Sequence, residues 1–498
     1  MEGNTRYVIG YDLNDIQVQI SYFELDNESP GTLVSDGENE RLGVPTVLCK
    51  RKRVNQWSFG TEAQRLIMRD GEAEVNKLLS LALSGKAITI EGEDFNGIDL
   101  LILFVRKTLK LLSVYVSVEQ IESFVFTVPK LDREMLSVLE RLSAAVPIER
   151  SRIMFQGYSE AVYCYMIHQP EELWDPECVI FDHDGKTMTA YHMHMNHRTT
   201  PIVGVIDKTE FEGLSIPDMS TYYDEEEDTA FEDADAGGDD GKASGTDEEN
   251  ENRDRESVKE RPLACSDDTE HLGNENDSGT EADIQDLRNA RVVVSSEKEI
   301  DVMDEKLYNL IHEFLITRTV RSAYLLGQGF DGEWCGKTIR FLCMGRRVFQ
   351  GSNMYSKGAC YYGMDKLFPS ENNDRYIFLG EDKLKFNLGI YIDRNGQEEY
   401  IALADGGENW FDISAEVEFL LKSGSKVQLI VTPLDGKEIR VMDIVLDGLP
   451  ERPPKTTRLK LWVIFSSGNT VKAVVKDMGF GEIFQSSGLA WDKELTIE

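Results

Sequence analysis

The fold prediction starts from two segments, Val8-Ile9-Gly10-Tyr11-Asp12-Leu13-Asn14-Asp15 and Val179-Ile180-Phe181-Asp182-His183-Asp184-Gly185-Lys186-Thr187. In each segment an apolar run ends at an aspartate and continues into turn-forming residues. Short apolar runs bounded by turn residues indicate buried strands. A carboxylate at the end of a buried strand requires a cation or hydrogen-bond donors beside it. We therefore expect Asp12 and Asp182 to face a cleft, with turn N–H groups beside them that could face a phosphate.

The residues around these two segments predict a mixed α/β region. A turn at Asn14-Asp15 leads into a second strand over residues 18–23, which completes a hairpin. Apolar positions at three- and four-residue spacing predict helices over residues 62–83, 97–112, 132–145 and 303–319. Further strands are expected over residues 124–128, 179–182, 188–195 and 322–326.

A strongly acidic segment interrupts this region. Between residues 221 and 290 the chain has 25 acidic and 6 basic side chains, which accounts for about half of its formal net charge of −37. The segment is rich in Gly, Ser, Asn, Asp and Glu and has almost no aromatic residues. Such a composition does not bury enough apolar area to offset its ordering entropy, so residues 223–295 are predicted to be a disordered insert. The α/β region then consists of residues 1–222 and 296–368.

The last part of the chain has a different pattern. From residue 369 to residue 498, short apolar alternations are separated by turn signals such as Asp393-Arg394-Asn395-Gly396, Asp435-Gly436 and Ser467-Gly468-Asn469. Turns at this spacing are typical of antiparallel strands, so this region is predicted to be a β-sandwich.

Charge and hydropathy limit the possible partners and location. The acidic balance of 90 Asp and Glu against 53 Lys and Arg repels phosphate backbones, which argues against nucleic-acid binding. No apolar run reaches the roughly 18–20 residues of a membrane helix. The amino terminus has no basic and apolar leader, and the seven cysteines are scattered without a CxxC pair. These features predict a cytoplasmic protein with no membrane contact.

Histidines form a second candidate cluster beside Asp182. His183, His192, His194 and His197 lie within fifteen residues, and His192 and His194 would share one face of a strand. Two histidines on one face could share a metal ion. A polar sheet surface is the favoured interpretation, because no cysteine or carboxylate completes a tetrahedral set in the sequence.

The order of the remaining motifs carries a resemblance to a known family. The motifs that follow the first segment are Val44-Pro45-Thr46, Phe59-Gly60, Val125-Phe126-Thr127-Val128-Pro129, Leu325-Leu326-Gly327-Gln328-Gly329-Phe330 and Gly358-Ala359. This succession resembles the actin-like ATPase superfamily, and within it the nucleotide domain of the seventy-kilodalton heat-shock chaperones. Residues 446–477 look like the second half of that family's substrate-binding sandwich.

The resemblance implies a fold and a ligand. The fold would be a duplicated, ribonuclease-H-like nucleotide domain of two lobes, followed by the antiparallel sandwich. ATP or ADP with Mg²⁺ would bind between the lobes, with Asp12 and Asp182 as catalytic residues that also position the metal. Gln156 matches the place where actin-type members have a catalytic glutamine. The matching nucleotide-binding residues are Asn14, Asp15, Gly185, Lys186, Thr187, Gly327, Gln328, Gly329 and Phe330.

Several residues depart from the family pattern. Asn14, Asp15 and Ile16 replace a glycine and small hydroxyl residues, and Asp184 and Lys186 stand where the second loop has glycines. An added carboxylate repels a phosphate, and a side chain restricts the approach of backbone to it. The predicted function is therefore a heat-shock-chaperone-like protein, with weak ATPase activity at most, that engages a protein or peptide client through its sandwich. The alternative is a catalytically inactive pseudo-ATPase that acts as a protein-interaction scaffold.

Overall fold

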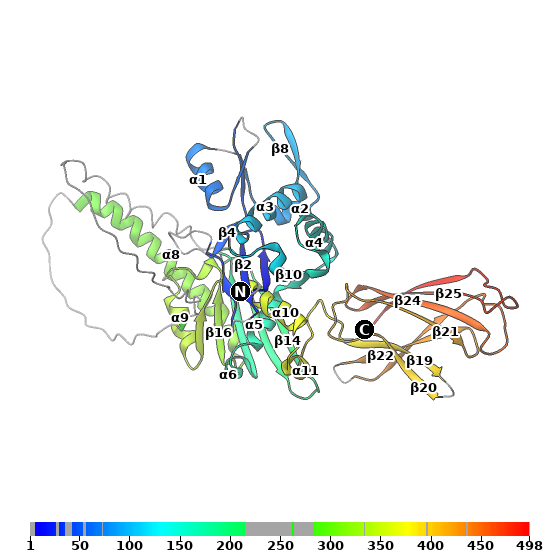
Figure 1. The fold of residues 1–498 in the computed structure, drawn as a ribbon. Helices are drawn as coiled ribbons and strands as arrows, with labels where there is room; N and C mark the ends of the chain where they lie inside the picture. Colours follow the sequence, from blue (N-terminus) through cyan, green and yellow to red (C-terminus); the bar gives the residue numbers. More distant parts are fainter. Residues whose placement is uncertain are drawn as a thin grey trace, which may run out of the picture.

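The chain forms a mixed α/β region followed by an antiparallel, strand-rich region, as predicted (Figure 1). The computed structural model describes residues 5–25, 29–34, 42–52, 56–71, 73–214, 261–262, 283–332, 334–394, 397–434 and 437–497. Most of the predicted acidic insert, residues 223–295, lies outside the described residues. Within it, helix α8 (Asp283–Leu315) already begins at Asp283, so the predicted insert extends too far at its C-terminal end.

The first large sheet is built around strand β1, which contains Asp12. Its strands are β1 (Tyr7–Leu13), β2 (Gln17–Glu24), β3 (Gly31–Thr32), β4 (Gly43–Pro45), β10 (Ile121–Val128) and β11 (Ile153–Gly157), in the order β11-β10-β1-β2-β3 with β4 also on β2. Strand β1 is antiparallel to β2 and parallel to β10, which is in turn parallel to β11. The predicted hairpin at Asn14-Asp15 is confirmed.

The second large sheet repeats this arrangement around the second segment. Its strands are β12 (Glu177–His183), β13 (Met188–Asn196), β14 (Ile202–Phe211), β15 (Arg261–Pro262), β16 (Ser322–Leu326), β17 (Arg347–Gln350) and β18 (Tyr376–Phe378), in the order β15-β17-β16-β12-β13-β14-β18. Strand β12 is antiparallel to β13 and parallel to β16, and β16 is parallel to β17. Strands β12, β13, β16 and β17 therefore correspond in order and direction to β1, β2, β10 and β11.

Helices and two small sheets complete the α/β region. The helices in this part of the chain are α1 (Gly60–Asp70), α2 (Leu78–Leu83), α3 (Gly97–Leu112), α4 (Arg133–Ala145), α5 (Tyr158–Ile167), α6 (Glu171–Trp174), α8, α9 (Gly336–Cys343), α10 (Met354–Leu367) and α11 (Glu371–Arg375). The small sheets contain β5 (Leu48–Lys50), β6 (Trp57–Phe59) and β7 (Ala73–Val75), and β8 (Ala87–Ile90) and β9 (Glu93–Asn96).

One predicted helix, over residues 62–83, is wrong. Helix α1 ends at Asp70 because Gly71 follows in a left-handed conformation with φ of 58°, which side-chain-bearing residues adopt only with strain. Strand β7 then intervenes before α2. The apolar spacing of both helices fits one continuous helix, and only Gly71 marks the break.

Helices α5 and α10 cross between the two large sheets. At the crossing, a Cβ atom on Gly358 would lie 2.0 Å from the carbonyl oxygen of Ala161, so only glycine allows this approach. The two helices join the sheets into one core, in which Val8, Val125, Ile180 and Tyr324 are all buried.

The sandwich consists of two four-stranded antiparallel sheets. One has the order β20-β19-β22-β23 and the other β21-β24-β25-β26. Their strands are β19 (Phe386–Arg394), β20 (Gln397–Ala404), β21 (Ser414–Leu421), β22 (Lys426–Pro433), β23 (Arg440–Val445), β24 (Thr457–Ser467), β25 (Thr470–Asp477) and β26 (Ala490–Thr496). Leu388, Leu429, Leu461 and Val475 pack between the sheets. The predicted boundary at residue 369 is too early, because β18 pairs with β14 of the α/β region and the sandwich strands begin at Phe386.

No helix among the described residues is both long enough and apolar enough to cross a membrane.

Candidate functional site

The ends of β1 and β12 meet at a cavity of about 840 Å³. Asp12 and Asp182 both line it, together with residues from the two turns that follow them. The structure thus brings together the two predicted aspartates from positions far apart in the sequence. Each comes from the central strand of its own sheet, because each sheet pairs that strand with a hairpin partner on one side and a parallel strand on the other.

A pair of tyrosines holds the two aspartates. Tyr158, the first residue of α5, donates a hydrogen bond of 2.6 Å to Asp12 Oδ1. Tyr355, in the first turn of α10, donates a hydrogen bond of 2.6 Å to Asp182 Oδ2. The two rings stack almost parallel, with their centroids 3.7 Å apart. The same Tyr–Asp contact therefore occurs twice, once at β1 of the first large sheet and once at β12 of the second.

Burial makes both carboxyl groups weak acids. Burial raises the pKa of Asp12 to about 7, and the nearby charge of Asp182 raises it further against the opposing effect of the Tyr158 hydrogen bond. Burial likewise raises the pKa of Asp182 to about 6, with a contribution from Asp184. A cation beside these groups would lower both values, and the Tyr hydroxyls supply only part of that stabilisation.

The turn after Asp12 is closed by its own side chain. Asn14 Oδ1 accepts hydrogen bonds from the backbone N–H groups of Ile16 and Gln17, at 2.8 and 3.0 Å. Its amide group donates to Tyr158 Oη at 3.0 Å. Asp15 turns toward α2, where its carboxylate accepts from the backbone N–H of Ser80 at 3.0 Å and from its hydroxyl. Two N–H groups of this turn, those of Ile16 and Gln17, are therefore already bonded.

The turn after Asp182 is closed in the same way. Asp184 Oδ1 accepts from the backbone N–H groups of Lys186 and Thr187, at 2.8 and 2.7 Å, and its Oδ2 accepts from the Thr187 hydroxyl. His183 Nδ1 accepts the N–H of Gly185 at 2.9 Å. A carboxylate thus occupies the position at the turn that an anionic ligand would need.

Five of the nine predicted nucleotide-binding residues line the cavity. Those that line the cavity are Asn14, Asp15, Thr187, Gly327 and Gln328, beside Asp12 and Asp182. Gly185 and Lys186 belong to the second turn but do not line the cavity. A Cβ on Gly327 would lie 2.7 Å from Asp182 Oδ1, so glycine is required for this close approach.

Three predicted site residues have packing roles instead. Gln156 is buried within the first sheet, where its side chain accepts from Thr127 Oγ1 at 3.2 Å, so the predicted catalytic role has no geometric basis. Gly329 lies against the His183 ring, which leaves no room for a side chain. Phe330 is buried in the core of the second sheet and packs edge-to-face with His183.

Sequence reasoning missed the residues that give the cavity its character. Tyr158, Tyr355, Tyr191, Lys208 and Glu210 all line it. An aromatic residue at the start of an apolar helix is usually part of a core, and nothing local distinguishes Tyr158 from that case. The signal that could have found it is the equivalent position of Tyr355 at the start of the corresponding helix in the other half.

The predicted cluster divides in the structure, because His183 is fully buried against Phe330, whereas His192 and His194 stack on β13 beside carboxylates. His192 Nε2 lies 3.2 Å from Glu177 Oε2, and His194 Nε2 lies 3.3 Å from Asp207 Oδ2. Within the described ranges, no group of three or more His, Cys, Asp or Glu side chains is arranged to hold a metal ion.

Comparison with known families places the chain in a family without an assigned activity. Residues 29–256 and 268–381 match the family of unknown function DUF5716, in its C-terminal part, and the chain belongs to this family. Residues 383–497 match a domain of unknown function, DUF8552. The junction of the two matches falls where β18 ends and the sandwich begins. No curated protein matches the chain.

Proposed function

We propose that this chain is an actin-like pseudo-ATPase, related in architecture to the seventy-kilodalton heat-shock chaperones, that acts as a protein-interaction scaffold. Its α/β region supplies a rigid two-lobed body, and its sandwich engages a protein partner. The observation that carries the proposal is that Asn14 and Asp184 each accept two N–H groups of their own turn, which are then not available to a phosphate.

The topology supports the actin-like part of the proposal. Four strands of each large sheet have the same order and direction as four of the other, as a duplicated ribonuclease-H-like fold requires. The helices α5 and α10 cross at Gly358, which belongs to the Gly358-Ala359 motif of the resemblance. Strand-end aspartates from both halves line one cavity.

Contacts within the two turns oppose the binding of a magnesium nucleotide. Displacing Asp184 from Lys186 N and Thr187 N would break two hydrogen bonds and leave a carboxylate facing the incoming phosphate. Asn14 similarly occupies the N–H groups of the first turn. The tyrosine pair already occupies one oxygen of each strand-end aspartate.

The sandwich is the element best suited to bind a protein. It has its own core, and β23 forms an edge of its sheet with Val441 and Val445 exposed. An edge strand offers unpaired backbone groups and alternate side chains to an added strand of a partner.

The second candidate function is binding of Mg-ATP or Mg-ADP in the cavity. It is favoured by the two aspartates and by a cavity volume within the roughly 300–1,000 Å³ of small-molecule sites. In this case the turn side chains would swing away when the nucleotide enters.

A thermal-shift titration of the full chain distinguishes the two. A ligand at one hundred times its Kd adds about 2.7 kcal/mol to stability. The pseudo-ATPase proposal predicts no change in Tm with millimolar Mg-ATP or Mg-ADP, for the wild type and for Asp182→Asn alike. A saturable rise in Tm for the wild type that Asp182→Asn abolishes would overturn the proposal and establish nucleotide binding.

A further inference from the structure

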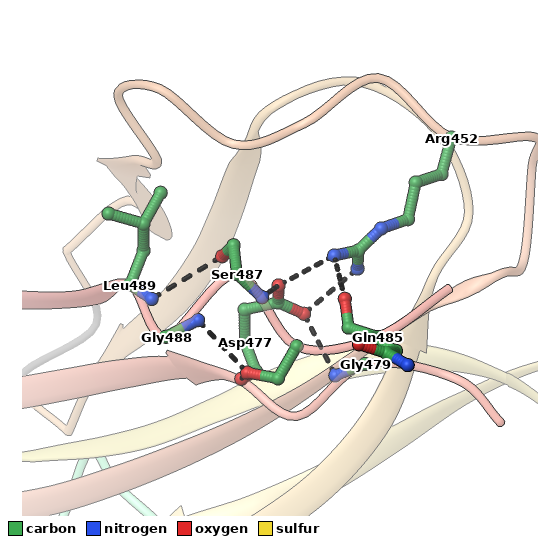
Figure 2. A network of polar contacts seen from close by, with 8 residues as sticks. Arg452, Asp477, Gly479, Gln485, Ser487, Gly488 and Leu489 are labelled. Atoms are coloured by element: carbon green, nitrogen blue, oxygen red, sulfur yellow. Dashed lines mark hydrogen bonds and ion pairs between the residues drawn. The ribbon is translucent and has the colours of Figure 1, made fainter. Parts of the chain in front are cut away.

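A loop at one end of the sandwich is held rigid by a buried ion pair. We call residues 478–489, between β25 and β26, the distal loop. Arg452 donates two hydrogen bonds to the carboxylate of Asp477, at 2.9 and 2.8 Å, and one of 2.9 Å to the carbonyl of Gln485 (Figure 2). The Asp477 carboxylate also accepts the N–H groups of Gly479 and Ser487, at 3.0 and 2.8 Å.

This network fixes the shape of the distal loop before any partner binds. Asp477 is buried, and its carboxylate bonds backbone groups near both ends of the loop. Gly479, Gly481 and Gly488 have φ values of 67°, 69° and 74°, which permit the tight path of the chain. A rigid loop loses little conformational entropy on binding, which favours tight association.

The rigid loop exposes apolar side chains. Ile483 is 86% exposed and Phe480 is 43% exposed, although both belong to residue types that are commonly buried. The loop contains one charged residue, Glu482, which lies between these two positions in the sequence. Two apolar side chains around one carboxylate suit a complementary surface that is apolar with a basic edge.

The distal loop lies at the end of the sandwich remote from the α/β region. The opposite end of β25 begins at the turn after Ser467, and at this end Arg133 of α4 donates to the carbonyl of Ser466. Strand β25 runs from there to Asp477, so the loop is separated from the α/β region by the length of the strand. Its apolar side chains are accessible to another molecule.

The α/β region has a groove with the matching properties. The groove between the C-terminal ends of α3 and α4 has a volume of about 420 Å³ and is lined mainly by apolar side chains, including Leu109, Val116 and Ile148. Its charged lining residues are two cations, Arg106 and Lys110. This absence of carboxylates in the lining is notable in a chain with 90 acidic and 53 basic residues.

We propose that the distal loop of one copy of this chain docks in the α3–α4 groove of a second copy. Ile483 and Phe480 would enter the apolar floor, and Glu482 would face Arg106 and Lys110. Loop and groove are different surfaces of the chain, so the contact is heterologous, and any assembly that does not close into a ring has a free loop at one end and a free groove at the other. The inference goes beyond the proposed function and does not depend on the state of the cleft.

Sedimentation velocity of the full chain over a concentration series tests the proposal. The wild type is expected to form dimers and larger species with increasing concentration. Ile483→Asp should weaken this association by at least about tenfold, because it places a charge in the apolar floor. The groove variant Lys110→Glu with Ser113→Glu, both at exposed positions, should do the same by repelling Glu482. The matched controls are Ile439→Asp, an exposed sandwich residue outside the loop, and Lys86→Glu.

Mixing the two deficient variants provides the decisive measurement. The loop variant retains an intact groove and the groove variant retains an intact loop, so an equimolar mixture should form a one-to-one dimer and nothing larger. Each variant alone should remain monomeric with an unchanged Tm. A wild type that stays monomeric at high concentration would overturn the proposal. So would association that persists in both variants, or a mixture in which no dimer forms.

Discussion

Tyr158 and Tyr355 stack face to face at the centre of the α/β region, and each donates a hydrogen bond to the strand-end aspartate of its own half. The stacked tyrosines thus connect the two carboxyl groups through neutral hydroxyl donors and add no positive charge beside them. Charge repulsion between Asp12 and Asp182 is therefore only partly relieved, and it contributes to the raised pKa of Asp12. The energetic consequences of this arrangement can be measured.

Asp12→Asn is expected to stabilise the protein at neutral and alkaline pH. Burial raises the folded-state pKa of Asp12 from its ordinary value of 3.8 to about 7. The folded state therefore prefers the protonated acid, and its stability falls as pH rises from about 4 through 7. Asparagine keeps the acceptor for Tyr158 without the charge. Urea denaturation should show a gain of about 1–3 kcal/mol at pH 8 that shrinks toward pH 4. An equal gain at both pH values would show that the raised pKa of Asp12 is not its cause.

Tyr158→Phe should lower the free energy of unfolding, in contrast to Asp12→Asn. It removes the hydrogen bond that lowers the pKa of Asp12 and leaves a buried carboxylate with one donor fewer. Hydrogen bonds to charged groups contribute about 1.5–3 kcal/mol, so a loss of this size is expected at pH 8. The loss should be smaller at pH 5, where Asp12 is mostly protonated. In the double variant Asp12→Asn with Tyr158→Phe, the two effects should not add, because the residues are in direct contact.

The crossing of α5 and α10 predicts a strong effect of one added methyl group. Gly358→Ala places a Cβ 2.0 Å from the carbonyl oxygen of Ala161, and backbone must move to accommodate it. We expect a loss of about 1–3 kcal/mol or more in denaturant unfolding. Gly336→Ala is the matched control, because that helical glycine has open space around it. The control should be neutral or gain up to about 1 kcal/mol from higher helix propensity. Equal stability of both variants would show that the helices do not cross as described.

The sequence predicted the fold where local pattern and tertiary structure agree. The strands that end in Asp12 and Asp182 are continuous apolar runs, and both the hairpin and the antiparallel partner of the second strand follow from turn residues. It failed for the helix over residues 62–83, because apolar spacing alone does not show that Gly71 ends one helix before a strand. It also placed the sandwich boundary too early, because the pairing of β18 with β14 is a contact distant in sequence.

The sequence predicted the two aspartates of the candidate site but not the contacts around them. The strand-end aspartates could be placed, because a charge at the end of an apolar strand has few alternatives. The closure of the two turns could not, since the sequence does not show whether Asn14 and Asp184 bond their own backbone or face a ligand. The position of Gln156 could not be predicted, because an error of one residue in the register moves a side chain to the other face of the sheet. In the structure the Gln156 side chain is buried and bonds Thr127 of the neighbouring strand.

A buried ion pair connects helix α5, whose first residue Tyr158 lines the cavity, to the start of the sandwich. Lys383 Nζ lies 2.5 Å from Glu160 Oε1 of α5, and its ammonium group also donates to Asn409 Oδ1 at 2.5 Å. Glu160→Gln removes the carboxylate that pairs with the buried lysine, which should lower the free energy of unfolding by about 3–5 kcal/mol. Hydrogen exchange should also accelerate at the N–H groups of Leu384 and Trp410, whose backbone bonds hold this junction.

Glu140→Gln is the control for this pair. Glu140 forms an ion pair of 2.6 Å with Arg150, but about half of each side chain is exposed to solvent. Exposed pairs contribute about 0–1 kcal/mol, so the control should be close to the wild type. If Glu160→Gln and Glu140→Gln have the same small effect, the junction is held by apolar packing and backbone bonds and not by the buried charges.

The Arg452–Asp477 pair should govern the acid stability of the sandwich. Burial alone would raise the pKa of Asp477, but hydrogen bonds from Arg452 and from the N–H groups of Ser487 and Gly479 hold it well below its usual range. The folded state therefore prefers the carboxylate. The resulting stabilisation is fully present above the unfolded-state pKa of about 3.9 and is lost as pH falls below it. Asp477→Asn removes this stabilisation and leaves the Arg452 charge buried without its partner. We therefore expect the free energy of unfolding to fall by about 3–5 kcal/mol at pH 7.

Denaturation of the full chain at pH 7 and pH 3, with hydrogen exchange over residues 478–489, measures both parts of this prediction. The difference between Asp477→Asn and the wild type should narrow at pH 3, and the distal loop of the variant should exchange faster. Asp443→Asn is the matched control on the same domain, because Asp443 pairs with Lys426 on an exposed surface at 2.8 Å. It should stay within about 1 kcal/mol of the wild type. A distal loop that remains fully protected in Asp477→Asn would mean that its glycines and apolar contacts, and not the carboxylate, determine its shape.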